Sequence, residues 1–296
     1  MQVGLALPTM AAGWTRATWL DWCRVADEGP FASISTGERI TFHNPEILTA
    51  LAACAALTSR VRVMTNVVVT PWHATTLLAK QLATIDVICD GRLDVGIGVG
   101  ARGQDYESVG ASMSYRHDKV DQQAAELRRL WSGGAPVPGA PPLGPPTVQP
   151  GGPDLYSGAL GPKATARAAQ WAKGITGFSL NLDVDEINRA ITMADEAWAA
   201  AGRDEPPRFV TACFYAIDDP DASLLRQFAY DYFEIFGVEV AKMMAPAAAL
   251  STAAKLGDAL ARVAAETRTD EVILVPASVH PALATGAADV AAARLG

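Results

Sequence analysis

Short apolar runs and longer helical patterns alternate along almost the whole chain. Eight runs have the length and the β-branched composition of strands, and they cover residues 2–7, 31–35, 61–69, 93–99, 154–159, 174–180, 208–216 and 271–275. Helical patterns lie between and after them, at residues 15–28, 45–58, 75–89, 118–131, 162–172, 185–201, 223–244, 252–267 and 281–295. Alternation of this kind predicts parallel strands joined by crossover helices.

The spacing of the strands favours a closed barrel over an open sheet. Eight strand–helix units in a barrel need about 250 residues, or about 31 per unit. The first four runs begin at residues 2, 31, 61 and 93. An open dinucleotide-binding sheet is the alternative, but residues 6–10 read ALPTM where that fold carries a GxGxxG turn. We therefore predict an α/β fold, a single (β/α)8 TIM barrel that occupies residues 1–296 as one domain.

Two intervals between strands are too long for a plain barrel. The first, between the strands that start at residues 93 and 154, contains a stretch dense in proline and glycine at 133–153. This stretch predicts an ordered excursion or lid. The second, between the strands that start at residues 208 and 271, has one helix too many. We predict insertions after strands 4 and 7, and we expect both to shape the substrate site.

The charge and the apolar pattern argue against several kinds of partner. The net charge is −8 with a pI near 5.0 and scattered basic residues, which disfavours nucleic acid or an anionic membrane as the main partner. The longest apolar run, residues 47–57, is too short to span a bilayer, and the N-terminal residues lack the basic region of a signal peptide. The four cysteines show no CxxC or CxxH spacing, which indicates reduced thiols in a cytoplasmic protein.

The fourth predicted strand ends in a cluster of glycines. Residues 92–100 read RLDVGIGVG, an apolar alternation that includes Gly96, Gly98 and Gly100 and opens into a polar loop at 101–106. Glycine removes side chains where the backbone must pass close to a bulky planar or phosphorylated ligand. Because TIM-barrel enzymes build their sites at the C-terminal ends of the strands, we expect the functional site here.

Charged and titratable residues follow the neighbouring strands. Glu38 and Arg39, after the second strand, form either a surface ion pair or a group that orients a cofactor ring or a substrate. His43 and His73 follow the second and third strands, where a role in proton transfer is possible. The histidines show no HxH or HExxH pattern, so we expect no metal site.

The segment after the fifth strand has a pattern suited to phosphate. Gly161 and Pro162 have the pattern of an N-cap and first helical residue, and free backbone N–H groups at such a helix start attract anions. Lys163 adds positive charge, and Arg102 and Arg116 are candidates to close over the same anion. The alternative is that the Gly-Pro pair only starts a helix and that the arginines are solvated.

Four segments form a recognisable combination. They are GERI (residues 37–40), RVRVMTNVVVTPWH (60–73), LLAKQLATIDVICDGRLDVGIGVGARGQDYESVG (77–110) and LGPKATARAAQWA (160–172). Together they resemble the luciferase-like flavin-dependent oxidoreductase family, which includes bacterial luciferase, reduced-FMN monooxygenases and enzymes that use the deazaflavin coenzyme F-420. The likeness covers residues 2–180, and the C-terminal third matches only in its strand–helix pattern. The resemblance implies a TIM barrel, in agreement with the strand spacing.

The resemblance also implies a flavin site at the C-terminal ends of the strands. Family members carry a non-proline cis peptide as a bulge in the third strand, behind the face of the flavin ring, and the alignment places it between Val67 and Val68. Thr70 falls where the deazaflavin enzymes contact their cofactor. The implied cofactor-binding residues are Asn66, Val67, Val68 and Thr70 on and after the third strand, Gly98, Val99 and Gly100 on the fourth, and Arg116, Leu160 and Gly161 at the phosphate.

Two positions depart from the family pattern. Many members follow the second strand with an acidic residue and a catalytic histidine, whereas Glu38 is followed here by Arg39. Arg39 is too basic to act as a general base, so we expect it to bind an anionic substrate or to stabilise negative charge on a flavin. Glu38, Arg39 and His43 are the catalytic candidates. Val99 replaces the phosphate-binding arginine that luciferase carries on the fourth strand, which leaves both FMN and coenzyme F-420 open.

The resemblance predicts a cytoplasmic oxidoreductase that acts on a small organic substrate with a reduced flavin. Reduced FMN, delivered by a separate flavin reductase, would serve a monooxygenase that consumes dioxygen. Reduced coenzyme F-420 would instead serve hydride transfer. Homodimers are common in the family. The alternative from another class is a non-catalytic flavin-binding barrel.

Overall fold

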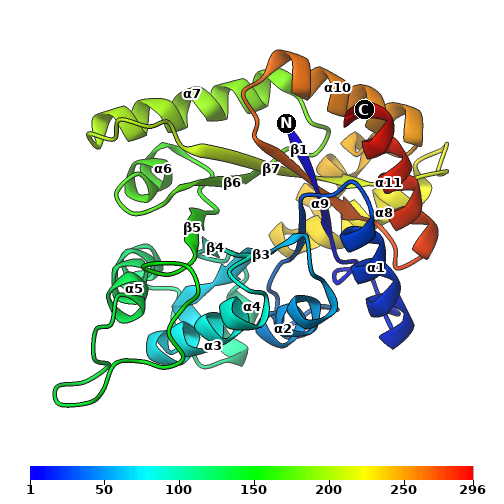
Figure 1. Ribbon diagram of the computed structural model, residues 1–296. Coiled ribbons are helices and arrows are strands. Elements are labelled where there is room, and N and C mark those ends of the chain that lie inside the picture. Colours follow the sequence, from blue (N-terminus) through cyan, green and yellow to red (C-terminus); the bar gives the residue numbers. More distant parts are fainter. Residues whose placement is uncertain (296) are drawn as a thin grey trace. The chain divides into compact units, whose positions relative to one another are not determined.

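The computed structural model describes residues 1–295 and contains eight parallel strands that close into a barrel in chain order (Figure 1). The strands are β1 (Gln2–Ala6), β2 (Ser33–Thr36), β3 (Arg62–Val69), β4 (Leu93–Gly98), β5 (Asp154–Ser157), β6 (Gly174–Phe178), β7 (Arg208–Tyr215) and β8 (Glu271–Pro276). Every predicted strand is present, with ends that differ by at most two residues. The predicted TIM barrel is confirmed.

Helices follow the strands as the alternation predicts. They are α1 (Arg16–Glu28), α2 (Ile47–Leu57), α3 (Thr75–Ile88), α4 (Gly103–Ser108), α5 (Arg116–Trp131), α6 (Pro162–Ala168), α7 (Val184–Ala200), α8 (Ser223–Phe233), α9 (Val238–Met244), α10 (Ala253–Glu266) and α11 (Pro281–Leu295). Short 3-10 turns lie at η1 (Thr70–Trp72), η2 (Glu234–Phe236) and η3 (Ala245–Ala247). The insertions predicted after strands 4 and 7 are present.

Two helical segments differ from the prediction. The expected polar loop at 101–106 contains the start of α4, because Asp105 and Tyr106 are buried and fix this segment against the barrel. The single helix expected at 223–244 is divided into α8, η2 and α9. Gly237 lies at the division with φ of 110°, a conformation that ends a right-handed helix.

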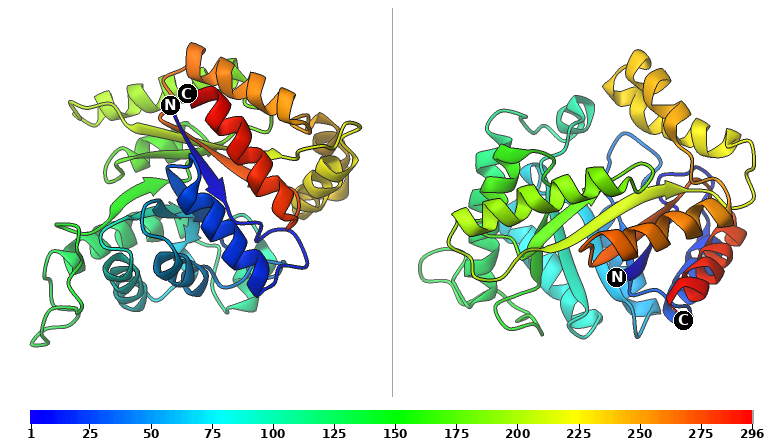
Figure 2. Two further views of the ribbon diagram at one scale, coloured as in Figure 1. Left: turned by 45° about the vertical axis from the view of Figure 1, so that its right-hand side comes forward. Right: turned by 90° about the horizontal axis from the view of Figure 1, so that it is seen from above.

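Contacts divide the chain into two compact units. The first consists of Met1–Ser35, Gly177–Met193 and the chain from Arg208 onward, and the second consists of Thr36–Thr176 and Ala194–Pro207. In the first unit β8 pairs with both β7 and β1, and α11 packs between α1 and α10 (Figure 2). In the second unit β3, β4, β5 and β6 pair in order. All candidate site residues lie in the second unit.

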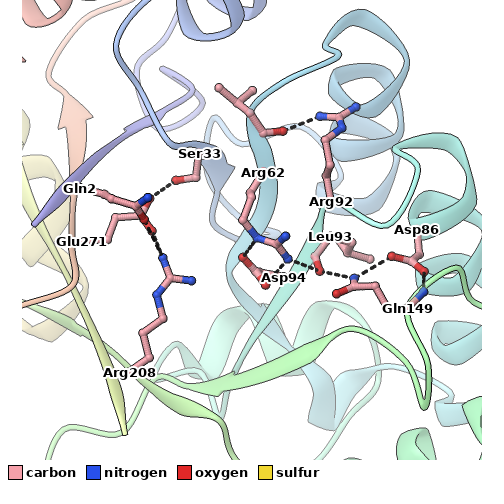
Figure 3. A network of polar contacts seen from close by, with 11 residues as sticks. Gln2, Ser33, Arg62, Asp86, Arg92, Leu93, Asp94, Gln149, Arg208 and Glu271 are labelled. Atoms are coloured by element: carbon pink, nitrogen blue, oxygen red, sulfur yellow. Dashed lines mark hydrogen bonds and ion pairs between the residues drawn. The ribbon is translucent and has the colours of Figure 1, made fainter. Parts of the chain in front are cut away.

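A buried carboxylate joins the strands of the first unit. Glu271, whose side chain is 3% exposed, accepts a hydrogen bond from Ser33 Oγ and forms an ion pair with Arg208 Nη2 at 2.7 Å. The same Nη2 donates to Gln2 Oε1 at 3.2 Å (Figure 3). Gly4 leaves room for this cluster, because a Cβ there would lie 2.6 Å from Glu271 Oε1. One carboxylate thus connects residues of β1, β2, β7 and β8.

The proline- and glycine-rich segment 133–153 is fixed at the N-terminal end of β4. The buried Asp86 carboxylate accepts from Val148 N at 2.8 Å and from Gln149 N at 3.1 Å. Gln149 Nε2 donates to Asp86 Oδ1 at 2.8 Å and to Leu93 O, at the start of β4, at 2.7 Å (Figure 3). The prediction of a lid that shapes the substrate site is therefore wrong. The segment leads from α5 into the start of β5, opposite the strand ends that carry the site.

We expect Asp86→Ala to release this segment and to lower the free energy of unfolding by about 2–4 kcal/mol, because three hydrogen bonds to a buried carboxylate are lost. Urea unfolding measures the loss, and limited proteolysis should show new cleavage within 133–147. Glu107→Ala, at an exposed carboxylate on α4, is the control and should change neither result. Unchanged proteolysis of Asp86→Ala would contradict this role.

The four cysteines are buried, and each carries a thiol rather than a disulfide. Among the helices of residues 1–295, none is long and apolar enough to cross a membrane.

Candidate active site

A bulge interrupts β3. The strand is in register with β4 up to Thr65, the register shifts before Val68, and the intervening Asn66–Val67 bond is a cis peptide. The predicted non-proline cis peptide of the third strand is present, but it lies one residue earlier than the Val67–Val68 bond. The reason is the position of the bulge. Val68 already pairs with Ile97 of β4, so the extra residue lies before it.

The side chain of Val67 occupies space that three glycines leave free. A Cβ on Gly98 would lie 2.5 Å from Val67 Cγ2, and a Cβ on Gly96 or Gly158 would lie 3.2 or 3.3 Å from Val67 Cγ1. The sequence predicted that a ligand requires the glycines of β4. The structure adds a second requirement, which comes from the neighbouring strand: Gly98 makes room for Val67, and a Cβ on Gly96 would also lie 2.3 Å from Thr65 O. Gly158, which the sequence analysis missed, borders the same side chain.

Neighbouring strands fix the backbone of the bulge. A Cβ on Gly37 would lie 2.9 Å from Asn66 O, so only glycine fits there without a shift. Asn66 Oδ1 accepts from Thr176 Oγ1 of β6 at 2.8 Å. Glu38 N donates to Val67 O at 3.2 Å. Asn66 and Val67 are therefore held from the chain after β2 and from β6, and both remain partly exposed.

Helix α5 holds the turn η1 that follows β3. Gln123 Nε2 donates to Thr70 O at 2.9 Å and lies 3.2 Å from His73 O. Lys119 Nζ donates to Pro71 O at 2.5 Å. Thr70 is fully buried, and its Oγ1 has no hydrogen-bond partner within the described chain. The turn thus has a fixed backbone and one hydroxyl available to a further group.

Glu38 is paired with a histidine that lies 35 residues further along the chain. Glu38 Oε1 lies 2.8 Å from His73 Nε2, and Glu38 Oε2 accepts from Val69 N at 2.7 Å. The side chains of Glu38 and His73 are 3% and 18% exposed. Glu38 is therefore not part of a surface ion pair with Arg39. The catalytic prediction omitted His73, although its place after the third strand was a usable signal.

The other two catalytic candidates lie around Phe42. The guanidinium carbon of Arg39 is 4.8 Å from the centroid of the Phe42 ring, and that of Arg102 is 5.4 Å from it. His43 is exposed, and its ring centroid also lies 4.8 Å from that of Phe42. Glu38, Arg39 and His43 therefore do not form one hydrogen-bonded group, because Glu38 bonds to His73 and Val69 instead.

The end of β4 packs against α4. Gly100 has φ of +64°, a conformation that other residues rarely adopt. Tyr106 OH donates to Val99 O at 2.5 Å, and the Tyr106 ring meets Trp72 edge to face at 5.2 Å. Burial raises the pKa of Tyr106 to about 12, against the opposing effect of the positive charge of Arg116. Tyr106 is therefore a neutral hydrogen-bond donor that fixes the predicted cofactor strand at Val99.

The predicted phosphate residues lie at the starts of α5 and α6. Arg116 is the first residue of α5, and its Nε is buried without a hydrogen-bond partner in residues 1–295. Leu160 is 79% exposed, and Gly161 is the N-cap of α6 with open space where a Cβ would lie. Arg167 of α6 forms an ion pair with Asp121 of α5 at 2.6 Å, which holds the two helices together.

A closed barrel with a cis-peptide bulge in the third strand is the arrangement that the sequence resemblance implies. The model of the family described as luciferase-like monooxygenase matches residues 1–272. The chain belongs to this family.

Two sequence relatives illustrate the likeness. An uncharacterized protein of Mycobacterium tuberculosis is 32% identical over 168 residues, which cover 54% of this chain and 58% of the relative. The oxygenase component of a flavin-dependent trigonelline monooxygenase of Acinetobacter baylyi is 31% identical over 119 residues, which cover 38% of this chain and 33% of the relative. The chain thus spans little more than half the length of the first relative and a third of the second.

Solved structures share the fold over nearly the whole chain. A monooxygenase from Streptomyces bottropensis has a TM-score of 0.80 at 22% identity and covers 100% of this chain and 98% of its own. A coenzyme F-420-dependent secondary alcohol dehydrogenase, in complex with an F-420–acetone adduct, has a TM-score of 0.74 at 16% identity. The match covers 98% of this chain and 97% of the dehydrogenase. The oxygenating constituent of 3,6-diketocamphane monooxygenase from Pseudomonas putida, in complex with FMN, has a TM-score of 0.71 at 18% identity. The match covers 93% of this chain and 91% of that protein.

Proposed function

We propose that this protein is an oxidoreductase that uses a reduced flavin, either reduced FMN with dioxygen or reduced coenzyme F-420, on a small organic substrate. The observation that carries the proposal is the bulge of β3 between Thr65 and Val68, which neighbouring glycines accommodate and where the resemblance implies the flavin face. The relative named as a flavin-dependent monooxygenase and the neighbours in complex with FMN and with an F-420 adduct support it.

The residues at this end of the strands fit a phosphorylated flavin. Thr70 Oγ1 and Arg116 Nε are buried polar atoms without a hydrogen-bond partner in the part of the chain that the structure describes. A buried polar group left unpaired costs about 1–3 kcal/mol, so a ligand that bonds to it recovers this free energy. In the proposal Thr70 bonds to the cofactor and Arg116 binds its phosphate with the backbone of Leu160 and Gly161.

The ring and the side chain of the cofactor are assigned to the two central strands. Asn66, Val67 and Val68 would support the ring, and the backbone from Gly98 to Gly100 would line the ribityl chain. The bound cofactor supplies the redox chemistry. The chain positions the reactants and excludes water, and the positive charge of Arg39 attracts an anionic group of the substrate.

The proposal extends to the organisation of the enzyme. It includes a single domain over residues 1–296, a homodimer and a cytoplasmic location. If the cofactor is FMN, a separate flavin reductase supplies it in reduced form. His43, exposed beside Phe42, stays in the proposal as a catalytic candidate.

Titration with each cofactor tests the proposal. Purified protein is titrated separately with FMN and with coenzyme F-420, and binding is followed by fluorescence quenching. We expect saturable binding of one cofactor, followed by turnover with dioxygen for FMN or by hydride transfer for coenzyme F-420. Absence of binding to either cofactor would overturn the proposal. Binding without any turnover would indicate a flavin-binding barrel without catalysis.

We expect Arg116→Ala to raise the Kd of the bound cofactor about 10- to 100-fold, because a hydrogen bond to a charged group contributes about 1.5–3 kcal/mol. The phosphate-free analogue, riboflavin or its deazaflavin counterpart, should bind equally to wild type and variant. Arg24→Ala, at an exposed arginine of α1, is the control and should bind both normally. An equal loss for the phosphate-free analogue would remove Arg116 from the phosphate site.

A further inference from the structure

We infer that His73 is the proton-transfer residue of this site and that Glu38 is its positioning residue. The inference rests on the proposed function, since it concerns the substrate of the flavin reaction. In many family members a histidine after the second strand is catalytic, and Arg39 occupies that position here. The inference gives this role to His73, which follows β3.

The carboxylate of Glu38 is fixed at both oxygens. Oε2 accepts from Val69 N at 2.7 Å, and Oε1 lies 2.8 Å from His73 Nε2. The Glu38 side chain is 3% exposed, so water does not compete for these contacts. A buried carboxylate that bonds to one imidazole nitrogen sets the ring orientation and the tautomer of the histidine.

The remaining nitrogen of His73 is available. The backbone of His73 is anchored, because its N donates to Thr70 O at 2.9 Å and its carbonyl lies 3.2 Å from Gln123 Nε2. Nδ1 forms no hydrogen bond to any residue in 1–295, and the side chain is 18% exposed. One nitrogen is therefore held by a carboxylate, and the other is left without a hydrogen bond on a partly exposed side chain directly after the turn that follows β3.

This arrangement is that of a general base oriented by a carboxylate. In the proposal, neutral His73 carries its proton on Nε2, and this N–H donates a hydrogen bond to Glu38 Oε1. Nδ1 takes the proton of a substrate O–H group, so that the O–H bond breaks, the N–H bond forms and the electron pair stays on oxygen. The carboxylate of Glu38 stabilises the resulting imidazolium. The reverse transfer returns the proton, and the flavin named in the proposed function accounts for the electrons of the redox step.

The surroundings distinguish His73 from His43. Besides Glu38, the carboxylate of Glu46 at the start of α2 interacts electrostatically with His73. His73 therefore interacts with two carboxylates, that of Glu38 by direct contact and that of Glu46 electrostatically. His43 is exposed, and its ring packs on Phe42 beside two arginines.

The first test is the tautomer of His73, read from long-range ¹H–¹⁵N correlation spectra of the whole protein at a pH where the ring is neutral. Assignment uses His73→Gln. We expect the proton on Nε2 in the wild type and a loss of this preference in Glu38→Gln. A proton on Nδ1 in the wild type, or an unchanged preference in Glu38→Gln, would overturn the inference. This readout needs no cofactor and no substrate.

The second test places Nδ1 relative to the cofactor. Diethyl pyrocarbonate modifies free imidazole nitrogens, and peptide mass spectrometry follows each histidine separately. We expect FMN or coenzyme F-420 to slow the modification of His73 in proportion to the fraction of protein that is bound. The exposed His117 is the control and should react at an unchanged rate. Unchanged modification of His73 in the flavin-bound protein would overturn the inference but leave the proposed function standing. A protein that binds neither cofactor fails the proposed function, and the tautomer alone then decides the inference.

The third test is turnover with the cofactor that binds. We expect His73→Gln to lower kcat at least about 100-fold, the usual contribution of general acid–base catalysis, while the Kd of the cofactor stays within about threefold. His117→Gln should turn over normally. A kcat of His73→Gln close to that of the wild type would contradict a catalytic role and leave His73 as a structural partner of Glu38.

Discussion

Gly98→Ala is expected to displace the Asn66–Val67 bulge and to weaken flavin binding about 100-fold. The new Cβ would lie 2.5 Å from Val67 Cγ2, a distance at which one of the two groups must move. β4 has little freedom to move, because Gly98 is paired with Val69 in the register of the barrel. The bulge moves instead, and a shift of about 1 Å at a site of this kind costs about 100-fold in function. Overpacking adds about 1–3 kcal/mol of destabilisation.

The crowding between the two side chains can be tested by relieving it. The double variant Gly98→Ala with Val67→Ala lacks the methyl groups that collide, so we expect it to recover much of the binding and stability lost in Gly98→Ala. Val67→Ala alone corrects for any direct loss of support to the flavin. Gly177→Ala is the control. Gly177 lies on β6, and a Cβ added there would lie 3.8 Å from the nearest neighbouring atom, Val210 O, which is an ordinary contact distance. Flavin titration and thermal unfolding provide the two readouts. A double variant no better than Gly98→Ala would show that a different contact requires the glycine.

The barrel is predictable from the sequence because its determinants are local. The β-branched runs at 61–69 and 208–216 and the spacing of about 31 residues per unit need only neighbouring residues to be recognised. The misplaced details depend on packing between distant parts of the chain. The sequence predicts a loop at the start of α4, because the burial of Asp105 and Tyr106 that fixes this helix is a tertiary effect. The only local sign of the break in helix 223–244 is the single glycine Gly237, and one glycine does not by itself predict the end of a helix.

The contacts among the predicted site residues could not be predicted from the sequence, because they depend on the register of neighbouring strands. The glycines of β4 are visible in the sequence, but the sequence does not show that they accommodate Val67, which comes from about 30 residues earlier in the chain. The pairing of Glu38 with His73 likewise requires knowledge that the ends of β2 and β3 lie together. The prediction for segment 133–153 names the wrong end of the barrel, although a segment between a helix and the next strand necessarily leads to the N-terminal side of that strand, here β5.

Glu271→Ala is expected to cause the largest loss of stability, about 3–5 kcal/mol. The Glu271 side chain is 3% exposed and its ion-pair partner Arg208 is 24% exposed, so the variant leaves a partly buried guanidinium without its carboxylate. Ser33 Oγ loses its acceptor as well. Because Arg208 retains some contact with water, we expect a value near the lower end of this range. Denaturant unfolding measures it.

The expected loss of stability in Glu271→Ala depends on the Arg208 charge that loses the Glu271 carboxylate. Two further variants test this directly. Glu271→Gln keeps an acceptor for Ser33 but removes the negative charge, so it should lose less than Glu271→Ala. The double variant Arg208→Met with Glu271→Met removes both charges and fills the space with apolar groups, and such replacements are often nearly neutral. We therefore expect the double variant to be more stable than Glu271→Ala. If it is less stable, the contribution of Glu271 comes from shape and hydrogen bonding around Gly4 and Ser33 rather than from the ion pair, because the double variant leaves no unpaired charge.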